Sequence, residues 1–261
     1  MTTAPVPEAA KALVRLELTC RLPGGVGPLC EFVRDRWLPA MYPGEKGRRV
    51  ALHTYDGKKF VKVTNIATKA GSIVYEAAVA RVDSEARGGK RLSLVSWITG
   101  RPFGYGPVGG DEIWATMVRD VDPGMHEYRV YMICPAEKAQ LLIGLAVETC
   151  STFEVLSGGS WSPGGWWPSW ADHRWKVLPL PPPMIVGPMW LVVAPAAANQ
   201  LLAGSDQALQ MAVDRHPLPD GGAVWQLCAE PDGPAGAELD TWSKVLTDLG
   251  IWAEPSIDSA R

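Results

Sequence analysis

The chain has 261 residues, of which 47% are hydrophobic and 20% are charged, and its formal net charge is −3. This composition predicts a folded globular protein and argues against an intrinsically disordered one. A net charge this small gives no support to nucleic-acid binding by itself. The length is enough for one large domain or two small ones.

The charges are unevenly distributed along the chain. Between Glu31 and Arg101 there are 14 basic and 7 acidic residues, whereas Asn199 to Arg261 holds 3 basic and 10 acidic residues. The two regions could face each other in one fold, or each could simply be solvated. Alternatively, the acidic region could be presented to a basic partner. The lysines around Phe60 alternate with apolar residues, which favours a solvated strand face over a nucleic-acid site.

Strand patterns dominate the first half of the chain. Alternating residues predict a strand from Leu13 to Cys20, and a helical spacing of apolar residues follows from Leu29 to Leu38. Asp56-Gly57 predicts a hairpin turn between two strands. These strands run from Val50 to Tyr55 and from Lys59 to Thr64, and further strands are expected at Ser72 to Val82, Arg91 to Thr99 and Glu127 to Cys134. The pattern of Glu112 to Val121 is ambiguous, and the glycines of Gly100 to Gly110 predict a loop.

Helices are more frequent in the second half. They are predicted at Ala136 to Cys150, Ala196 to Ala203, Ser205 to Val213 and Glu238 to Leu249. Strands are predicted at Met184 to Ala194 and Ala223 to Ala229, with a turn from Pro217 to Gly222. Strands grouped early, with helices interspersed later, indicate the α+β class. We expect an antiparallel or mixed sheet with flanking helices in one compact unit. The expected domain spans 1–261, with a candidate sub-division near 157–183.

No constellation of residues predicts chemistry. The four histidines and five cysteines show neither the spacing of a metal site nor a C-x-x-C pair, so neither a metal nor a cofactor is expected. Cys20, Cys134 and Cys228 each end an apolar run, which is typical of buried thiols. An odd cysteine count and an N-terminus without a secretion signal predict five free thiols and a cytoplasmic protein. Val177 to Ser205 is uncharged, but its prolines argue against a membrane span.

Tryptophan is unusually abundant, with 12 residues in the chain. Four of them lie in a short segment rich in glycine and proline, namely Trp161, Trp166, Trp167 and Trp170. Such a segment predicts a packed loop, because neither a helix nor a strand tolerates this composition. The indoles could cover a small core, or they could bind a ligand or a protein partner.

The C-terminal third resembles a known group of proteins. An apolar stretch, Val186-Gly187-Pro-Met-Trp-Leu-Val-Val, is followed by a helical segment, then by Leu218-Pro-Asp-Gly-Gly-Ala-Val-Trp-Gln-Leu, an acidic loop and a final helix ending at Trp252. This order resembles uncharacterised α+β immunity proteins of bacterial polymorphic-toxin systems, including those of myxobacterial toxin loci. The resemblance implies a cytoplasmic protein that neutralises a cognate toxin by binding it.

Three hypotheses about function follow. The first is an immunity protein that contacts its toxin through the Trp-rich segment or through Glu230, Asp232, Glu238 and Asp240. The second is a hydrolase or glycan-processing enzyme with a dispersed site that uses the Trp-rich segment. The third is a phage-like or structural interaction protein. A converging set of His, Asp and Glu residues would favour the enzyme, and the sequence shows none.

Overall fold

The computed structural model describes residues 13–41, 43, 49–55, 60–67, 93–99, 114–122, 126–161, 185 and 187–252. The chain divides into two compact units, and each is described by itself. Unit 1 comprises residues 1–16 and 142–261, and unit 2 comprises residues 17–141. The boundaries therefore run through one strand, β1 (Leu13–Arg21), and one helix, α5 (Ala139–Thr152).

Unit 2 is built on an antiparallel sheet. Its strands follow the order β3-β2-β4-β5-β6-β1. The bounds are β2 (Arg49–Tyr55), β3 (Phe60–Ala67), β4 (Ser93–Thr99), β5 (Trp114–Asp122) and β6 (Glu127–Pro135). The strands β2 and β3 pair antiparallel with Tyr55 opposite Phe60, which confirms the predicted hairpin. The pairs β2–β4, β4–β5 and β5–β6 are also antiparallel.

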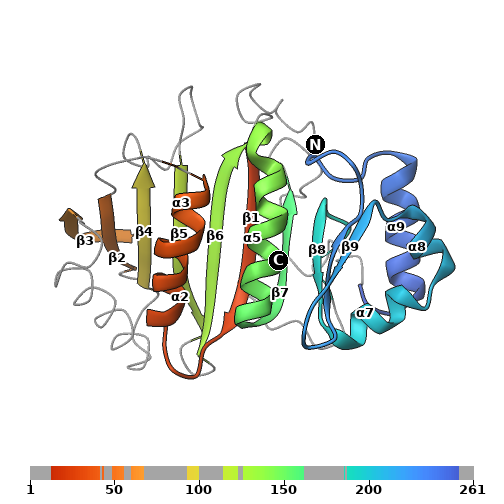
Figure 1. Ribbon diagram of the computed structural model, residues 1–261, viewed down its shortest axis with the longest axis horizontal. Helices are drawn as coiled ribbons and strands as arrows, with labels where there is room; N and C mark the ends of the chain where they lie inside the picture. Colours follow the sequence, from red (N-terminus) through yellow and green to blue (C-terminus); the bar gives the residue numbers. More distant parts are fainter. Residues whose placement is uncertain are drawn as a thin grey trace, which may run out of the picture. The chain divides into compact units, whose positions relative to one another are not determined.

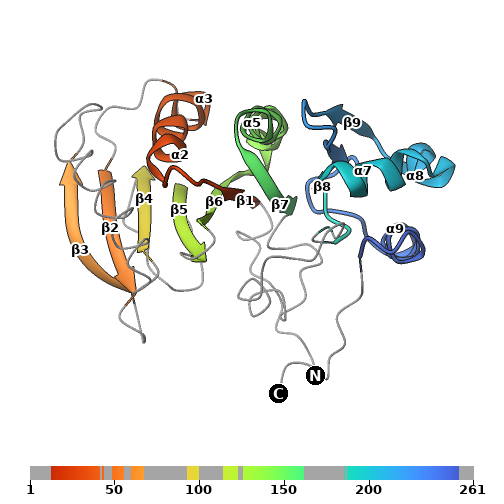
Figure 2. The ribbon, with the colours of Figure 1, turned by 90° about the horizontal axis from the view of Figure 1, so that it is seen from below.

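Short helical segments cover one face of this sheet (Figure 2). The predicted helix from Leu29 to Leu38 is present as α2 (Gly27–Phe32), a π-helical turn (Val33–Trp37) and α3 (Leu38–Met41). Leu29, Val33 and Trp37 recur at helical spacing and are fully buried. The burial of this apolar stripe explains why the segment is helical here.

The strands of unit 1 follow the order β7-β8-β10-β9 and pair antiparallel (Figure 1). The strands are β7 (Glu154–Trp161), β8 (Leu191–Ala194), β9 (Asp214–Pro217) and β10 (Ala223–Gln226). Three helices follow in the C-terminal part of the unit, α7 (Ala196–Ala203), α8 (Asp206–Met211) and α9 (Ala237–Asp248). The predicted helices at 196–203 and 238–249 are confirmed to within a residue at each end.

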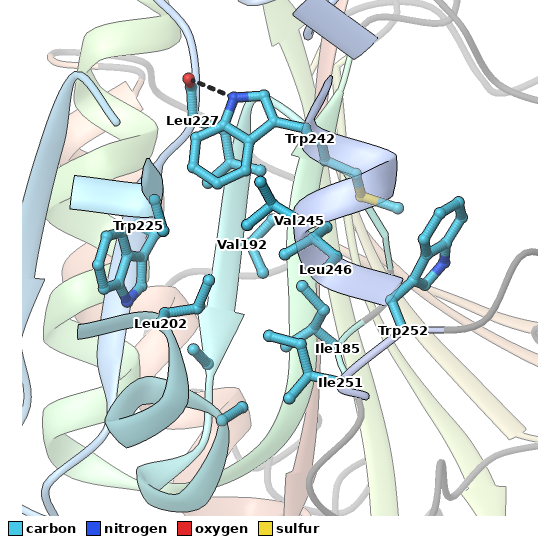
Figure 3. Close-up of a cluster of buried hydrophobic side chains, with 14 of the residues drawn as sticks. Ile185, Val192, Leu202, Trp225, Leu227, Trp242, Val245, Leu246, Ile251 and Trp252 are labelled. Carbon is cyan, nitrogen blue, oxygen red and sulfur yellow. Dashed lines mark hydrogen bonds between the residues drawn. The ribbon is translucent and has the colours of Figure 1, made fainter. Parts of the chain in front are cut away.

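One buried cluster of unit 1 lies on one face of its strands β8 and β10. Val192 and Trp225 are directly paired across β8 and β10, so their side chains lie on the same face. Both belong to one buried cluster with Leu202 of α7 and Leu246 of α9 (Figure 3). Trp242 completes the cluster, and its indole N–H donates to Leu227 O at 3.1 Å. The three helices thus bury their apolar sides against this face.

Four sequence predictions need correction or completion. The strand predicted from Met184 to Ala194 begins only at Leu191, and Gly187 before it has a φ of +144°. The strand predicted from Ala223 to Ala229 ends at Gln226. The helix predicted from Ser205 to Val213 ends at Met211, and strand β9 follows it. The ambiguous segment around 112–121 is strand β5. The predicted strand at 72–82 and the loop at 100–110 lie outside the described residues.

The α+β class with an antiparallel sheet and flanking helices is confirmed. The division into two compact units does not decide the number of domains, because two such units can belong to one folding domain. A single domain over 1–261, with a sub-division near 157–183, therefore stays a prediction. Within the described residues, no helix is long and apolar enough to cross a membrane. All five cysteines are free, as predicted, and all five are buried, including the three for which burial was predicted.

Candidate binding surface

The four acidic residues chosen from the sequence are all exposed in unit 1. Glu230 and Asp232 lie in the loop that follows β10, and Glu238 and Asp240 lie in the first turn of α9. Carboxylates in the first turn of a helix interact favourably with the positive end of its dipole. Glu238 and Asp240 lie on the solvent side of α9, because the opposite side of the helix carries the buried Trp242. We call these four residues the acidic surface.

Backbone hydrogen bonds shape the loop and fix where it enters α9. Gly233 N donates to Glu230 O at 3.1 Å within the loop, and Asp240 N donates to O of the N-cap Gly236 at 3.1 Å, which is the first helical bond of α9. Gly233 and Gly236 both have a positive φ, 86° and 53° respectively, and residues other than glycine rarely adopt this backbone conformation. The loop is therefore a defined turn structure that carries two carboxylates and leads into α9.

Three of these carboxylates act electrostatically on the buried thiol of Cys228. Its side chain is 4% exposed, and its thiol donates to Glu230 O at 3.3 Å. Burial raises the pKa of Cys228 to about 12, and the nearby charges of Glu238, Glu230 and Asp232 act in the same direction. Carboxylates from the loop and from α9 therefore lie near enough to one buried thiol to oppose its ionisation, and they create a local negative potential. This proximity is tertiary, and the sequence shows only that the residues are near in the chain.

The Trp-rich segment is placed only at its beginning. Trp161 is the last residue of strand β7. Trp166, Trp167 and Trp170 lie outside the described residues, so the choice between a packed cluster and a binding loop stays open. Among the side chains that the structure describes, five tryptophans are buried, namely Trp37, Trp190, Trp225, Trp242 and Trp252. At these positions the tryptophan side chains pack in the hydrophobic core.

Charged residues buried in strands were not predicted from the sequence. Glu17 of β1 and Arg129 of β6 form an ion pair in unit 2, with 2.8 Å between Arg129 Nε and Glu17 Oε1. Their side chains are 0% and 5% exposed, respectively. The neighbouring pair, Arg21 Nη2 and Glu127 Oε1, is 3.2 Å apart. Alternating polar residues on a strand usually face water, so the pattern alone gives no sign of this burial.

A second buried polar centre involves Asn199 of α7, which is 5% exposed. Its Nδ2 donates to Gly221 O at 2.8 Å, and its Oδ1 accepts from Trp225 Nε1 at 3.0 Å and from Arg215 Nε at 3.2 Å. The Arg215 guanidinium also lies 5.4 Å from the centre of the Trp225 ring. One amide thus joins α7, β9, β10 and the turn between the two strands. Its partners are the fully buried Trp225, the half-buried Arg215 and the exposed backbone of Gly221, so the amide ties the core to the β9–β10 turn, which indicates a structural role.

The described residues do not form a catalytic or metal-binding constellation. No group of three or more His, Cys, Asp or Glu side chains among them could hold a metal ion. His216 Nε2 and Asp214 Oδ2 lie 3.5 Å apart on the partly exposed strand β9. Adjacent alternate positions on a strand bring such side chains together without any catalytic requirement.

Comparison with known proteins adds a fold relationship. No family model matches the chain, and no curated protein matches it. Among solved structures, the chain is similar to the Pseudomonas aeruginosa T6SS protein PA0821, with a TM-score of 0.52 and 15% sequence identity. The match covers 92% of this chain and 76% of that chain. At this identity, the likeness shows a shared fold and carries no site residues across.

Proposed function

We propose that this protein is a non-enzymatic binding protein of the immunity type, which neutralises a cognate bacterial toxin in the cytoplasm. The acidic surface would contact a basic patch on the toxin. The observation that carries the proposal is that Glu230, Asp232, Glu238 and Asp240 are all exposed and lie on one loop and on the first turn of the helix that follows it. A fixed, exposed group of like charges accelerates association with a surface of opposite charge.

Two further observations support the proposal. The C-terminal pattern resembles immunity proteins of polymorphic-toxin systems, and this region supplies the acidic surface. The similar solved structure is named as a T6SS (type VI secretion system) protein, and a bacterial secretion setting is compatible with an immunity role. The enzyme hypothesis gains no support from any described residue.

The test is protection in living cells. The chain is co-expressed with the protein encoded beside it, and growth is measured with and without a variant of the acidic surface, Glu230→Lys, Asp232→Lys, Glu238→Lys and Asp240→Lys. We expect the wild type to protect and this variant to fail. A control variant reverses the same number of exposed carboxylates elsewhere, at Glu31, Glu137, Glu154 and Asp206. This control should still protect.

The control is matched for charge and includes one carboxylate at the same helix position as the acidic surface. Asp206 lies in the first turn of α8, as Glu238 and Asp240 do in α9, so both variants lose a favourable dipole interaction of about 0.3–1 kcal/mol per residue. Circular dichroism establishes that each variant is folded. Full protection by the folded acidic-surface variant would refute the proposed contact, and failure of both variants alike would show that total charge is decisive.

A further inference from the structure

The outer edge of the sheet in unit 1 is strand β9, the last in its order β7-β8-β10-β9. An edge strand exposes unpaired backbone groups and can recruit a strand from another molecule. Exposed apolar side chains near β9 in the sequence also favour self-association: Leu209 is 47% exposed and Val213 is 53% exposed. The backbone of β9 therefore decides whether the edge is open to pairing.

In every second residue of β9, the backbone N–H and C=O groups point towards the partner strand β10. His216 is opposite Val224 of β10, and Leu218 N donates to Gly222 O at 2.9 Å. In an antiparallel pair the backbone groups of the intervening residues point away from the partner. Arg215 and Pro217 therefore present their backbones to the open edge.

Neither of these residues offers a free donor there. Arg215 N donates to its neighbour's side chain, with 2.7 Å to Asp214 Oδ1. Pro217 has no N–H at all, and proline is typical of edges that do not accept another strand. The Arg215 side chain is held back by Asn199 and by the Trp225 ring, so it does not extend along the edge. Strand addition needs donors as well as acceptors, and β9 supplies no free donor.

We propose that Asp214 and Pro217 together close the edge of β9 against pairing with a second copy of this chain. This inference goes beyond the proposed function, since it concerns self-association and holds whatever the protein binds. The Asp214 carboxylate occupies one outward donor, and Pro217 removes the other. Exposed Leu209 and Val213 can then remain on the surface without leading to sheet extension.

The experiment restores both donors. In the variant Asp214→Ala with Pro217→Thr, the N–H groups of residues 215 and 217 become available to an incoming strand. Sedimentation velocity over a range of protein concentrations measures self-association. We expect the double variant to associate at least about tenfold more tightly than the wild type, because several backbone hydrogen bonds become available per dimer. Hydrogen exchange should show that the amides of 215 and 217 become protected upon association.

Two further variants separate this explanation from others. Asp206→Ala with Pro219→Thr changes the same residue types at exposed positions outside β9, and it should behave as the wild type. Asp214→Asn with Pro217→Thr keeps a side-chain acceptor but removes the charge, so it should associate less than the Ala variant. If Pro217→Thr unfolds the chain, Asp214→Ala alone should still raise association.

The inference is overturned by any of three results. The first is a folded Asp214→Ala, Pro217→Thr variant that associates no more than the wild type. The second is equal association of the control at residues 206 and 219. The third is a wild type that already self-associates with protection of the Arg215 amide.

Discussion

Asn199 provides the most informative test of the packing in unit 1. Replacement by alanine removes three hydrogen bonds at once and leaves the indole N–H of fully buried Trp225 without its partner. A buried polar group left without a partner costs about 1–3 kcal/mol, and the bond to Gly221 O contributes about 1 kcal/mol more. We therefore expect Asn199→Ala to lower the free energy of unfolding by about 2–4 kcal/mol.

A double-mutant cycle isolates the bond to Trp225. Trp225→Phe removes the indole N–H, so the stranded donor no longer contributes to the cost of Asn199→Ala in that background. The coupling energy between the two positions should be about 1–2 kcal/mol. The assay is urea unfolding of the four proteins, monitored by circular dichroism. The slopes of the four transitions are compared, because equal slopes show that the changes report stability. Additive effects, with no coupling, would show that Asn199 does not join α7 to β10 as described.

Three further predictions concern stability and redox state. Gly159→Ala should destabilise the protein by about 1–3 kcal/mol in thermal unfolding, because the added Cβ would lie 2.8 Å from Leu191 O; an unchanged melting temperature would contradict this close approach. Arg129→Met should cost about 3–5 kcal/mol by leaving buried Glu17 without its ion pair, and adding Glu17→Leu should restore most of it; if the second change restores nothing, the pair is not the cause. Titration of the denatured, unreduced protein should recover five thiols, and fewer would reveal a disulfide.

Local signals explain which parts of the fold were predictable. The hairpin of β2 and β3 is marked by Asp56-Gly57, and α9 is marked by its amphipathic pattern and by Gly250 at its end. Strand β7 was not predicted, because Gly158 and Gly159 interrupt its pattern. The structure explains Gly159, since a Cβ there would lie 2.7 Å from Met189 Sδ. A glycine required by the neighbouring strand looks, in the sequence, like a loop residue.

Strand β9 was missed for a related reason. It has four residues, ends at Pro217, and has no apolar alternation, so its strand character comes from pairing with β10. The acidic residues of the candidate site were visible as an excess of negative charge. Their electrostatic effect on buried Cys228 was not visible, because it depends on how the loop and α9 fold back onto β10. The burial of Glu17 likewise depends on tertiary structure.

Association with the protein encoded beside this chain tests the central claim most directly. The purified proteins are mixed, and the association rate constant is measured from low to high ionic strength. If the acidic surface steers binding, a one-to-one complex forms, the rate constant falls as salt rises, and reversal of Glu230, Asp232, Glu238 and Asp240 lowers it by about tenfold or more at low salt. Absence of a complex, or a rate constant indifferent to both salt and charge reversal, would contradict the account.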